Sequence, residues 1–106
     1  MSTADAFEPD LADVTLSQVM HALGDDLRLQ IVAVLAAEGE RRCGSIELGV
    51  SKATRSHHFR VLREAGITHT RVAGGARHVT LRREELEARF PGLLEAILAA
   101  APAAST

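Results

Sequence analysis

Apolar side chains recur at intervals of three and four residues along two early stretches of the chain, as they do on one face of an α-helix. The first stretch predicts a short helix over residues 15–23. The second predicts a strongly apolar helix over residues 25–38, which belongs at the centre of a core. The residues expected to cap or end these helices are Thr15 or Ser17, Gly24, Asp25 and Gly39. The apolar positions are Leu16, Val19, Met20, Leu23, Leu27, Ile31, Val34 and Leu35.

The next segments predict a short helix, a turn and a longer helix. A short helix is expected around residues 44–48, and the turn Gly49-Val50-Ser51 leads from it into a helix over residues 52–65. Ser51 is expected to cap this longer helix and Gly66 to end it. One face of the helix holds positions 55, 58, 59, 62 and 65, and its apolar anchors are Phe59, Leu62 and Ala65.

After Gly66 the spacing of apolar residues changes from helical to alternating. Two runs rich in Ile, Thr and Val flank Gly74-Gly75, which predicts a two-stranded hairpin. Helical spacing returns over residues 82–100, but Pro91 interrupts it because proline cannot continue a helix. We therefore expect the last segment to form two abutting helical pieces.

The order of these elements indicates a fold that is mainly α with a β-hairpin wing, a winged helix-turn-helix. The folded domain is expected to span residues 15–100. Residues 1–14 show no sustained period and are expected to form a flexible acidic tail, and residues 101–106 a frayed C-terminal tail.

Composition sets the size class and the compartment. The chain has 106 residues, 46% of them hydrophobic and 25% charged, which suits one small globular domain. No run of about 18 apolar residues is present to cross a membrane, and the first residues are acidic where a signal peptide is basic. The single cysteine, Cys43, forms no intrachain disulfide, which agrees with a reducing compartment. We expect a cytoplasmic protein with no membrane partner.

The net charge of −2 conceals a strongly basic middle. Residues 1–40 hold eight acidic residues and one arginine, whereas residues 41–83 hold ten basic residues and two acidic ones. A basic patch on a small domain is the electrostatic footprint expected for a polyanionic partner. A solvated basic face is the alternative, so the arrangement of the side chains has to decide.

The helix over residues 52–65 carries much of this positive charge on its polar face. Spacings of four, four and three align Lys52, Ser56, Arg60 and Arg63 on the expected outward side. Such a mixture of point charges, guanidinium forks and hydroxyl groups suits phosphates and base edges of double-stranded DNA. His69 and His78 along the hairpin arms are further contact candidates. The residues expected to contact DNA are Lys52, Thr54, Arg55, Ser56, His57, Arg60, Arg63, Arg71 and Arg77.

The sequence resembles the ArsR/SmtB family of bacterial transcriptional repressors. The resemblance covers about residues 17–98 and is carried by MHALGDDLRLQIVAVLA, SKATRSHHFRVLREAGI, the Gly74-Gly75 hairpin and LRREELEARFPGLLEAIL. It implies a homodimeric winged-helix repressor that binds an inverted-repeat operator in a promoter and responds to a signal. Pairing of the N- and C-terminal helices also agrees with their apolar faces, which so small a core cannot fully bury.

Two positions depart from the family pattern. Arg55 stands where the family usually has an aliphatic residue, and its spacing places it on the packed face of its helix. Its long stem could extend outward to a phosphate, or the residue could loosen the packing. The sequence GDDLRLQ replaces a common proline and threonine, but Asp25 and Asp26 still suit a helix N-terminus.

The metal sites common in the family are not expected here. Where the family commonly has a Cys-x-Cys pair, RRCGSIEL holds only Cys43, and residues 82–100 contain no histidine for the site on the last helix. His57 and His58 point about 100° apart on a helix and do not suit one metal ion, and His58 is expected to be a packed structural residue. His21 with Cys43, completed by Asp25 or Glu47, is kept as an alternative metal site.

Function therefore resolves into one main expectation and two alternatives. We expect a sequence-specific DNA-binding repressor without a cofactor, whose signal acts through another ligand, through Cys43 as a redox-sensitive thiol, or through a separate sensor or co-regulator protein. The alternatives are a metal-responsive repressor using His21 and Cys43, and a winged-helix protein-interaction module that does not bind DNA. No nucleophile motif, phosphate-binding glycine loop or paired-carboxylate spacing indicates an enzyme.

Overall fold

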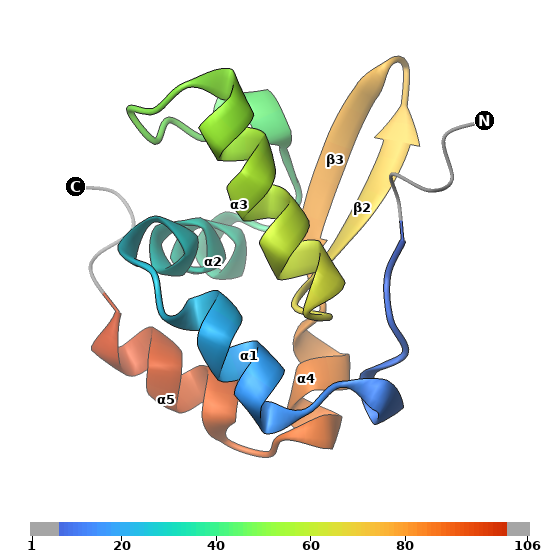
Figure 1. Ribbon diagram of the computed structural model, residues 1–106, viewed down its shortest axis with the longest axis vertical. Coiled ribbons are helices and arrows are strands. Elements are labelled where there is room, and N and C mark those ends of the chain that lie inside the picture. The colour runs from blue at the N-terminus through green and yellow to red at the C-terminus, as the bar shows by residue number, and fades with distance from the viewer. Residues whose placement is uncertain (1–6, 102–106) are drawn as a thin grey trace.

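The computed structural model describes residues 7–101, in which the helices pack beside and below a small antiparallel sheet (Figure 1). The radius of gyration, 13.0 Å, is that of a compact domain of about 100 residues. The helices are α1 (Leu16–Leu23), α2 (Asp26–Glu38), α3 (Lys52–Glu64), α4 (Arg83–Arg89) and α5 (Leu93–Ala100), with 3₁₀ turns η2 (Leu11–Asp13) and η3 (Cys43–Ser45). The strands are β1 (Arg41–Arg42), β2 (Thr68–Ala73) and β3 (Ala76–Leu81).

The three main helices begin at the residues whose side chains suit helix caps. The Thr15 hydroxyl accepts the backbone N–H of Gln18 at 3.1 Å, and the Gln18 side chain accepts the N–H of Thr15 at 2.7 Å, which completes a capping box. Asp25 caps α2, and Ser51 caps α3 by accepting the N–H of Thr54 at 3.1 Å. The predicted boundaries of these helices are therefore confirmed.

The hairpin is also confirmed, and it forms two strands of a three-stranded sheet. β2 and β3 pair antiparallel from Thr68 opposite Leu81 to Ala73 opposite Ala76, and Gly74-Gly75 makes the turn with positive φ at both glycines. The strand order is β1-β3-β2, so β3 is the central strand and β2 is an edge. In Figure 1 the hairpin projects beside α3.

The helix expected around residues 44–48 does not form. Arg41 and Arg42 instead pair with Val79 and His78 of β3 as strand β1, and a single 3₁₀ turn follows. The guanidinium of Arg41 donates to the hydroxyl and the carbonyl of Ser45, at 3.0 and 2.8 Å. The bonds from Arg41 to Ser45 and the pairing of β1 with β3 therefore fix this segment in an extended strand and a tight turn instead of an α-helix.

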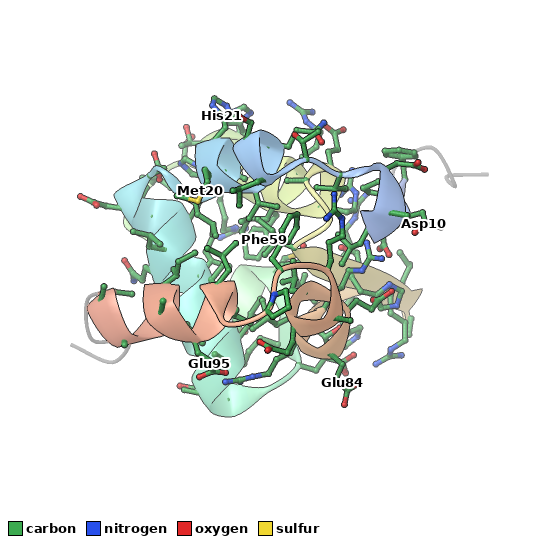
Figure 2. All side chains as sticks on the ribbon, turned by 90° about the horizontal axis from the view of Figure 1, so that it is seen from below. Asp10, Met20, His21, Phe59, Glu84 and Glu95 are labelled. Atoms are coloured by element: carbon green, nitrogen blue, oxygen red, sulfur yellow. The ribbon has the colours of Figure 1, made fainter. Side chains whose placement is uncertain are left out.

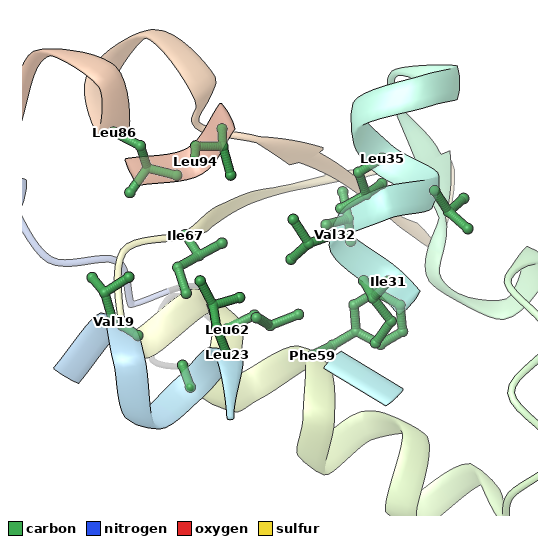
Figure 3. Close-up of a cluster of buried hydrophobic side chains, with 14 of the residues drawn as sticks. Val19, Leu23, Ile31, Val32, Leu35, Phe59, Leu62, Ile67, Leu86 and Leu94 are labelled. Atoms are coloured by element: carbon green, nitrogen blue, oxygen red, sulfur yellow. The ribbon is translucent and has the colours of Figure 1, made fainter. Parts of the chain in front are cut away.

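The core lies where α1, α2 and α3 meet the base of the hairpin (Figure 3). Four side chains at its centre are 0% exposed: Ile31 of α2, Leu62 of α3, Ile67 between α3 and β2, and Val79 of β3. Burial of one such side chain contributes about 1.5–3 kcal/mol, so this cluster fixes where α3 lies. Phe59 and Leu62 of α3 are buried as their spacing predicts.

Part of the segment expected to be a flexible tail is packed on this core. Leu11 and Val14 are 6% and 2% exposed, and the side chain of Arg89 donates to both of their carbonyl oxygens, at 3.1 and 3.0 Å. The expectation of a flexible tail is therefore wrong for residues 7–14. Two isolated apolar residues give no period in the sequence, but they suffice to anchor a segment whose backbone is bound by an arginine.

The C-terminal segment forms the two helical pieces that Pro91 predicts. α4 ends at Arg89, and α5 begins after Gly92, which has a φ of 80°. Residues 1–6 of the expected acidic tail and residues 102–106 of the expected frayed tail lie outside the described residues. Within residues 7–101, no helix has the length and apolar character needed to cross a membrane.

Candidate nucleic-acid interface

The solvent face of α3 carries most of the predicted DNA contacts. Lys52, Thr54, Ser56, His57 and Arg60 are all exposed there, while His58, Phe59 and Leu62 are buried on the opposite face. The Thr54 hydroxyl accepts a hydrogen bond from that of Ser51 at 3.0 Å at the start of the helix. The helix thus offers short polar and basic side chains to a partner while its apolar anchors hold it on the core.

A groove of about 680 Å³ runs between α3, the η3 turn and the hairpin. Its lining residues include no carboxylate, so their charged groups all carry the same sign. A concentration of like charges in a concave surface strengthens the local field and attracts anions. The cationic residues that line the groove are Arg42, Lys52, Arg55, Arg60, Arg63 and Arg77.

Arg63 does not lie on the exposed stripe where its spacing places it. It is 5% exposed, and its Nε donates to the carbonyl oxygen of Phe7 at 3.1 Å. The prediction of an outward side chain is wrong because the N-terminal segment covers this end of α3. Although it is buried, Arg63 is still one of the residues that line the groove.

Arg55 is half-buried, as its position on the packed face predicts. Its side chain lines the groove beside the η3 turn and the hairpin. A long cationic stem at this position therefore adds charge to a concave surface instead of filling the core.

The predicted contact residues of the hairpin differ in their surroundings. Arg71 forms an ion pair with Glu40 at 2.8 Å, and this hydrogen bond holds the pKa of Glu40 below its ordinary value. Arg77 lines the groove next to the turn. His69 is bound to Glu8, and the half-buried His78 lies opposite Arg71 in the strand register. Arg77 thus lines the groove, while Arg71 contacts Glu40 and His69 contacts Glu8.

His58 is the packed structural histidine that its helical position predicts. It is 7% exposed, and its Nδ1 lies 3.0 Å from Nη1 of Arg28, itself 8% exposed. Since arginine can only donate, His58 accepts at Nδ1 and its neutral form carries the proton on Nε2. Arg28 also donates to the carbonyl oxygens of His21 and Ala22 at the end of α1. The sequence did not predict this structural role of Arg28. The signal it offered was a single basic residue within a strongly apolar helix.

Cys43 lies in the groove among cations. Burial raises the pKa of its thiol, although the charges of Arg77, Arg55 and Arg63 act in the opposite direction. His21 is exposed on α1 (Figure 2). Within residues 7–101, no group of three or more His, Cys, Asp or Glu residues is suited to a metal ion.

Comparison with known proteins gives matches to bacterial regulators. Residues 25–70 match the profile of a family described as bacterial regulatory proteins of the arsR family. The chain is 38% identical over 88 residues to an uncharacterized HTH-type transcriptional regulator, YceK, of Bacillus subtilis (strain 168), which covers 80% of this chain and 88% of that protein. It is 35% identical over 74 residues to a homolog of the cadmium resistance transcriptional regulatory protein CadC from Staphylococcus aureus, covering 68% of this chain and 61% of that protein.

Proposed function

The chain belongs to the ArsR family of bacterial regulatory proteins, and from this premise we propose that it is a repressor that binds an inverted-repeat operator as a homodimer. The observation that carries the proposal is the groove between α3 and the hairpin, whose charged lining residues are all cationic and which opens beside the exposed face of α3. A DNA duplex is the polyanion whose phosphates and base edges suit that combination.

The proposal divides the contact residues into two roles. Ser56, His57 and Arg60 project from the exposed face of α3 and would meet base edges in the major groove. Lys52 at the start of α3, the half-buried Arg55 and Arg77 of the hairpin would meet backbone phosphates from the groove, which Ser56 and Arg60 also line. The buried Arg63 would add to the positive potential of the groove. Thr54 and Arg71 are weaker candidates for contact with DNA.

A second copy of the chain is the partner proposed for α1 and α5. Leu16 and Met20 are 50% and 49% exposed on α1, and Ile97 and Leu98 of α5 are half-buried. Figure 2 shows Met20 on α1, which in that view lies above α5. Association about a twofold axis would cover these side chains and set two copies of α3 about 34 Å apart, in successive major grooves.

For the signal, we infer that the protein uses something other than the usual metal sites of its family. Among the described residues neither His21 nor Cys43 belongs to a group of three or more possible metal ligands, and the burial that raises the pKa of Cys43 makes its thiol less reactive. We therefore propose that the signal comes from a ligand of another kind or from a separate sensor or co-regulator protein.

Fluorescence anisotropy tests the proposal directly. The protein is titrated against a duplex from its own upstream region and against a scrambled duplex, at two salt concentrations, with and without zinc or nickel. We expect selective binding that weakens steeply with salt, because neutralised phosphates release counterions, and that metal does not change. Metal-dependent binding would favour the His21 and Cys43 site, whereas no binding under any condition would favour a protein-interaction module.

A further inference from the structure

Three consecutive residues of the N-terminal segment each bind a different part of the fold. The carbonyl oxygen of Phe7 accepts from Arg63 of α3 at 3.1 Å, and that of Pro9 accepts from Arg82, just before α4, at 2.9 Å. Glu8, between them, binds strand β2. Figure 1 shows this segment, in dark blue, descending beside the base of the hairpin.

Glu8 provides the strongest of these contacts. One carboxylate oxygen accepts the backbone N–H of Thr70 at 2.7 Å, and the other lies 2.7 Å from Nδ1 of His69. β2 is an edge strand, so the N–H of Thr70 has no neighbouring strand to pair with and the carboxylate takes that place. The Glu8 side chain is 18% exposed, so water competes only weakly for these bonds.

Two of the residues that this segment binds, Arg63 and Thr70, line the basic groove. They come from its two walls, since Arg63 belongs to α3 and Thr70 to the hairpin. On the opposite edge of the sheet β1 pairs with β3, and Arg71 of β2 forms an ion pair with Glu40, next to β1, so these contacts also restrain the hairpin. The segment therefore bridges the two walls on the side that β1 does not reach.

We propose that Glu8 is a positioning residue for DNA binding, which fixes the hairpin relative to α3 so that the cationic groups of the two walls meet adjacent phosphates together. This inference rests on the proposed DNA-binding function. Glu8 is an acidic residue and does not itself contact the polyanion. It acts through Thr70 and His69, and its loss would leave the hairpin populating positions in which the groove fits the DNA backbone poorly.

The test compares Glu8→Ala and Glu8→Gln with Glu84→Ala, which removes an exposed glutamate of α4. Affinity is measured by anisotropy on the upstream and scrambled duplexes over a range of salt concentrations. For Glu8→Ala we expect about tenfold weaker binding to both duplexes and a shallower salt dependence, because a hairpin that is no longer fixed relative to α3 makes fewer phosphate contacts in the complex. Glu8→Gln retains a carbonyl oxygen for the Thr70 N–H and should recover part of the affinity, and Glu84→Ala should match the wild type.

Hydrogen exchange of the Thr70 amide separates positioning from general destabilisation. Exchange at Thr70 should accelerate in Glu8→Ala while the amides of the α2 core remain protected. A protein that is merely less stable would lose active fraction without any change in salt dependence. Affinity and salt dependence equal to the wild type, with faster exchange at Thr70, would overturn the inference. Failure of the wild type to bind DNA would instead overturn the proposed function, which the same titration reveals first.

Discussion

Gly66 shows how one residue position couples the end of α3 to the N-terminal segment. It adopts a φ of 80°, and a Cβ atom added there would lie 2.5 Å from Cδ2 of Leu11 and 3.2 Å from Cγ2 of Val14. Glycine is therefore needed twice, for the left-handed turn that ends the helix and for the close approach of the packed segment.

Gly66→Ala should consequently destabilise the protein more than a matched glycine substitution in the hairpin turn. Gly75 has a φ of 77°, but a Cβ atom added there would meet nothing within 4 Å, so Gly75→Ala measures the backbone strain alone, about 1–2 kcal/mol. Gly66→Ala should cost at least about 1 kcal/mol more because Leu11 must move. Urea denaturation of both variants measures the loss in the free energy of unfolding. Equal losses would show that Leu11 and the N-terminal segment move aside at no measurable cost.

Arg60 and Arg77 differ in placement, and this difference predicts different effects on binding. Arg60→Ala should weaken operator binding by roughly 1–3 kcal/mol and scrambled-duplex binding much less, because an exposed residue of α3 reads bases. Arg77→Ala should weaken binding to both duplexes by a similar factor, because it meets phosphates. Anisotropy titrations on both duplexes measure the two ratios. If Arg60→Ala weakened binding to both duplexes equally, Arg60 would not contact base edges in the way proposed.

At the scale of elements, α2 is the central helix on which α3 and the hairpin rest. Its N-terminus depends on Asp25, whose carboxylate accepts the N–H groups of Leu27 and Arg28 at 2.8 and 3.1 Å. Burial acts to raise the pKa of Asp25, but these hydrogen bonds and the charge of Arg28 outweigh it and hold the pKa below its ordinary value. The cap is thus strongest when the residue is ionised.

Asp25→Ala should lower the free energy of unfolding by about 1 kcal/mol at neutral pH. Because the folded protein lowers the pKa of Asp25, the unfolded chain binds more protons near pH 4, and the stabilisation is present above about pH 4 and is lost as the pH falls below it. Denaturation of the wild type, Asp25→Ala and Asp25→Asn across this range measures the effect. The asparagine side chain of the last variant keeps a capping oxygen and should show a smaller, pH-independent loss. A gap between wild type and Asp25→Ala that persists undiminished in acid would contradict the account.

At the scale of the whole molecule, the charges and the apolar surfaces lie in different places. The basic groove lies between α3 and the hairpin, whereas the half-exposed apolar side chains Leu16 and Met20 lie on α1. A twofold dimer through α1 and α5 would leave both basic grooves open to one duplex.

Met20→Lys should therefore weaken self-association and shift the molar mass in solution toward that of one chain, because a charge would be buried at the interface. Val72→Lys, at a hairpin residue that is 59% exposed, is the matched control and should leave the mass unchanged. Sedimentation equilibrium measures both variants, and an unchanged dimer in Met20→Lys would place the interface elsewhere.

The amino-acid sequence by itself determined the elements that local rules govern. Helical spacing with Asp25 and Ser51 as caps defined α2 and α3, and Gly74-Gly75 defined the hairpin, because caps, turns and amphipathic faces act over a few residues. The buried face of α3 and the structural role of His58 followed from the same periodicity.

Only the tertiary structure decided how segments distant in sequence meet. It paired Arg41 and Arg42 with β3 and left a single 3₁₀ turn in place of the helix expected around residues 44–48, packed Leu11 and Val14 on the core, and buried Arg63, which is bound to the carbonyl oxygen of Phe7. Each of these features joins segments far apart along the chain, through single backbone hydrogen bonds or isolated apolar contacts that leave no period in the sequence. The groove and the role proposed for Glu8 depend on those long-range contacts, whereas the helices and the hairpin that frame them depend on local ones.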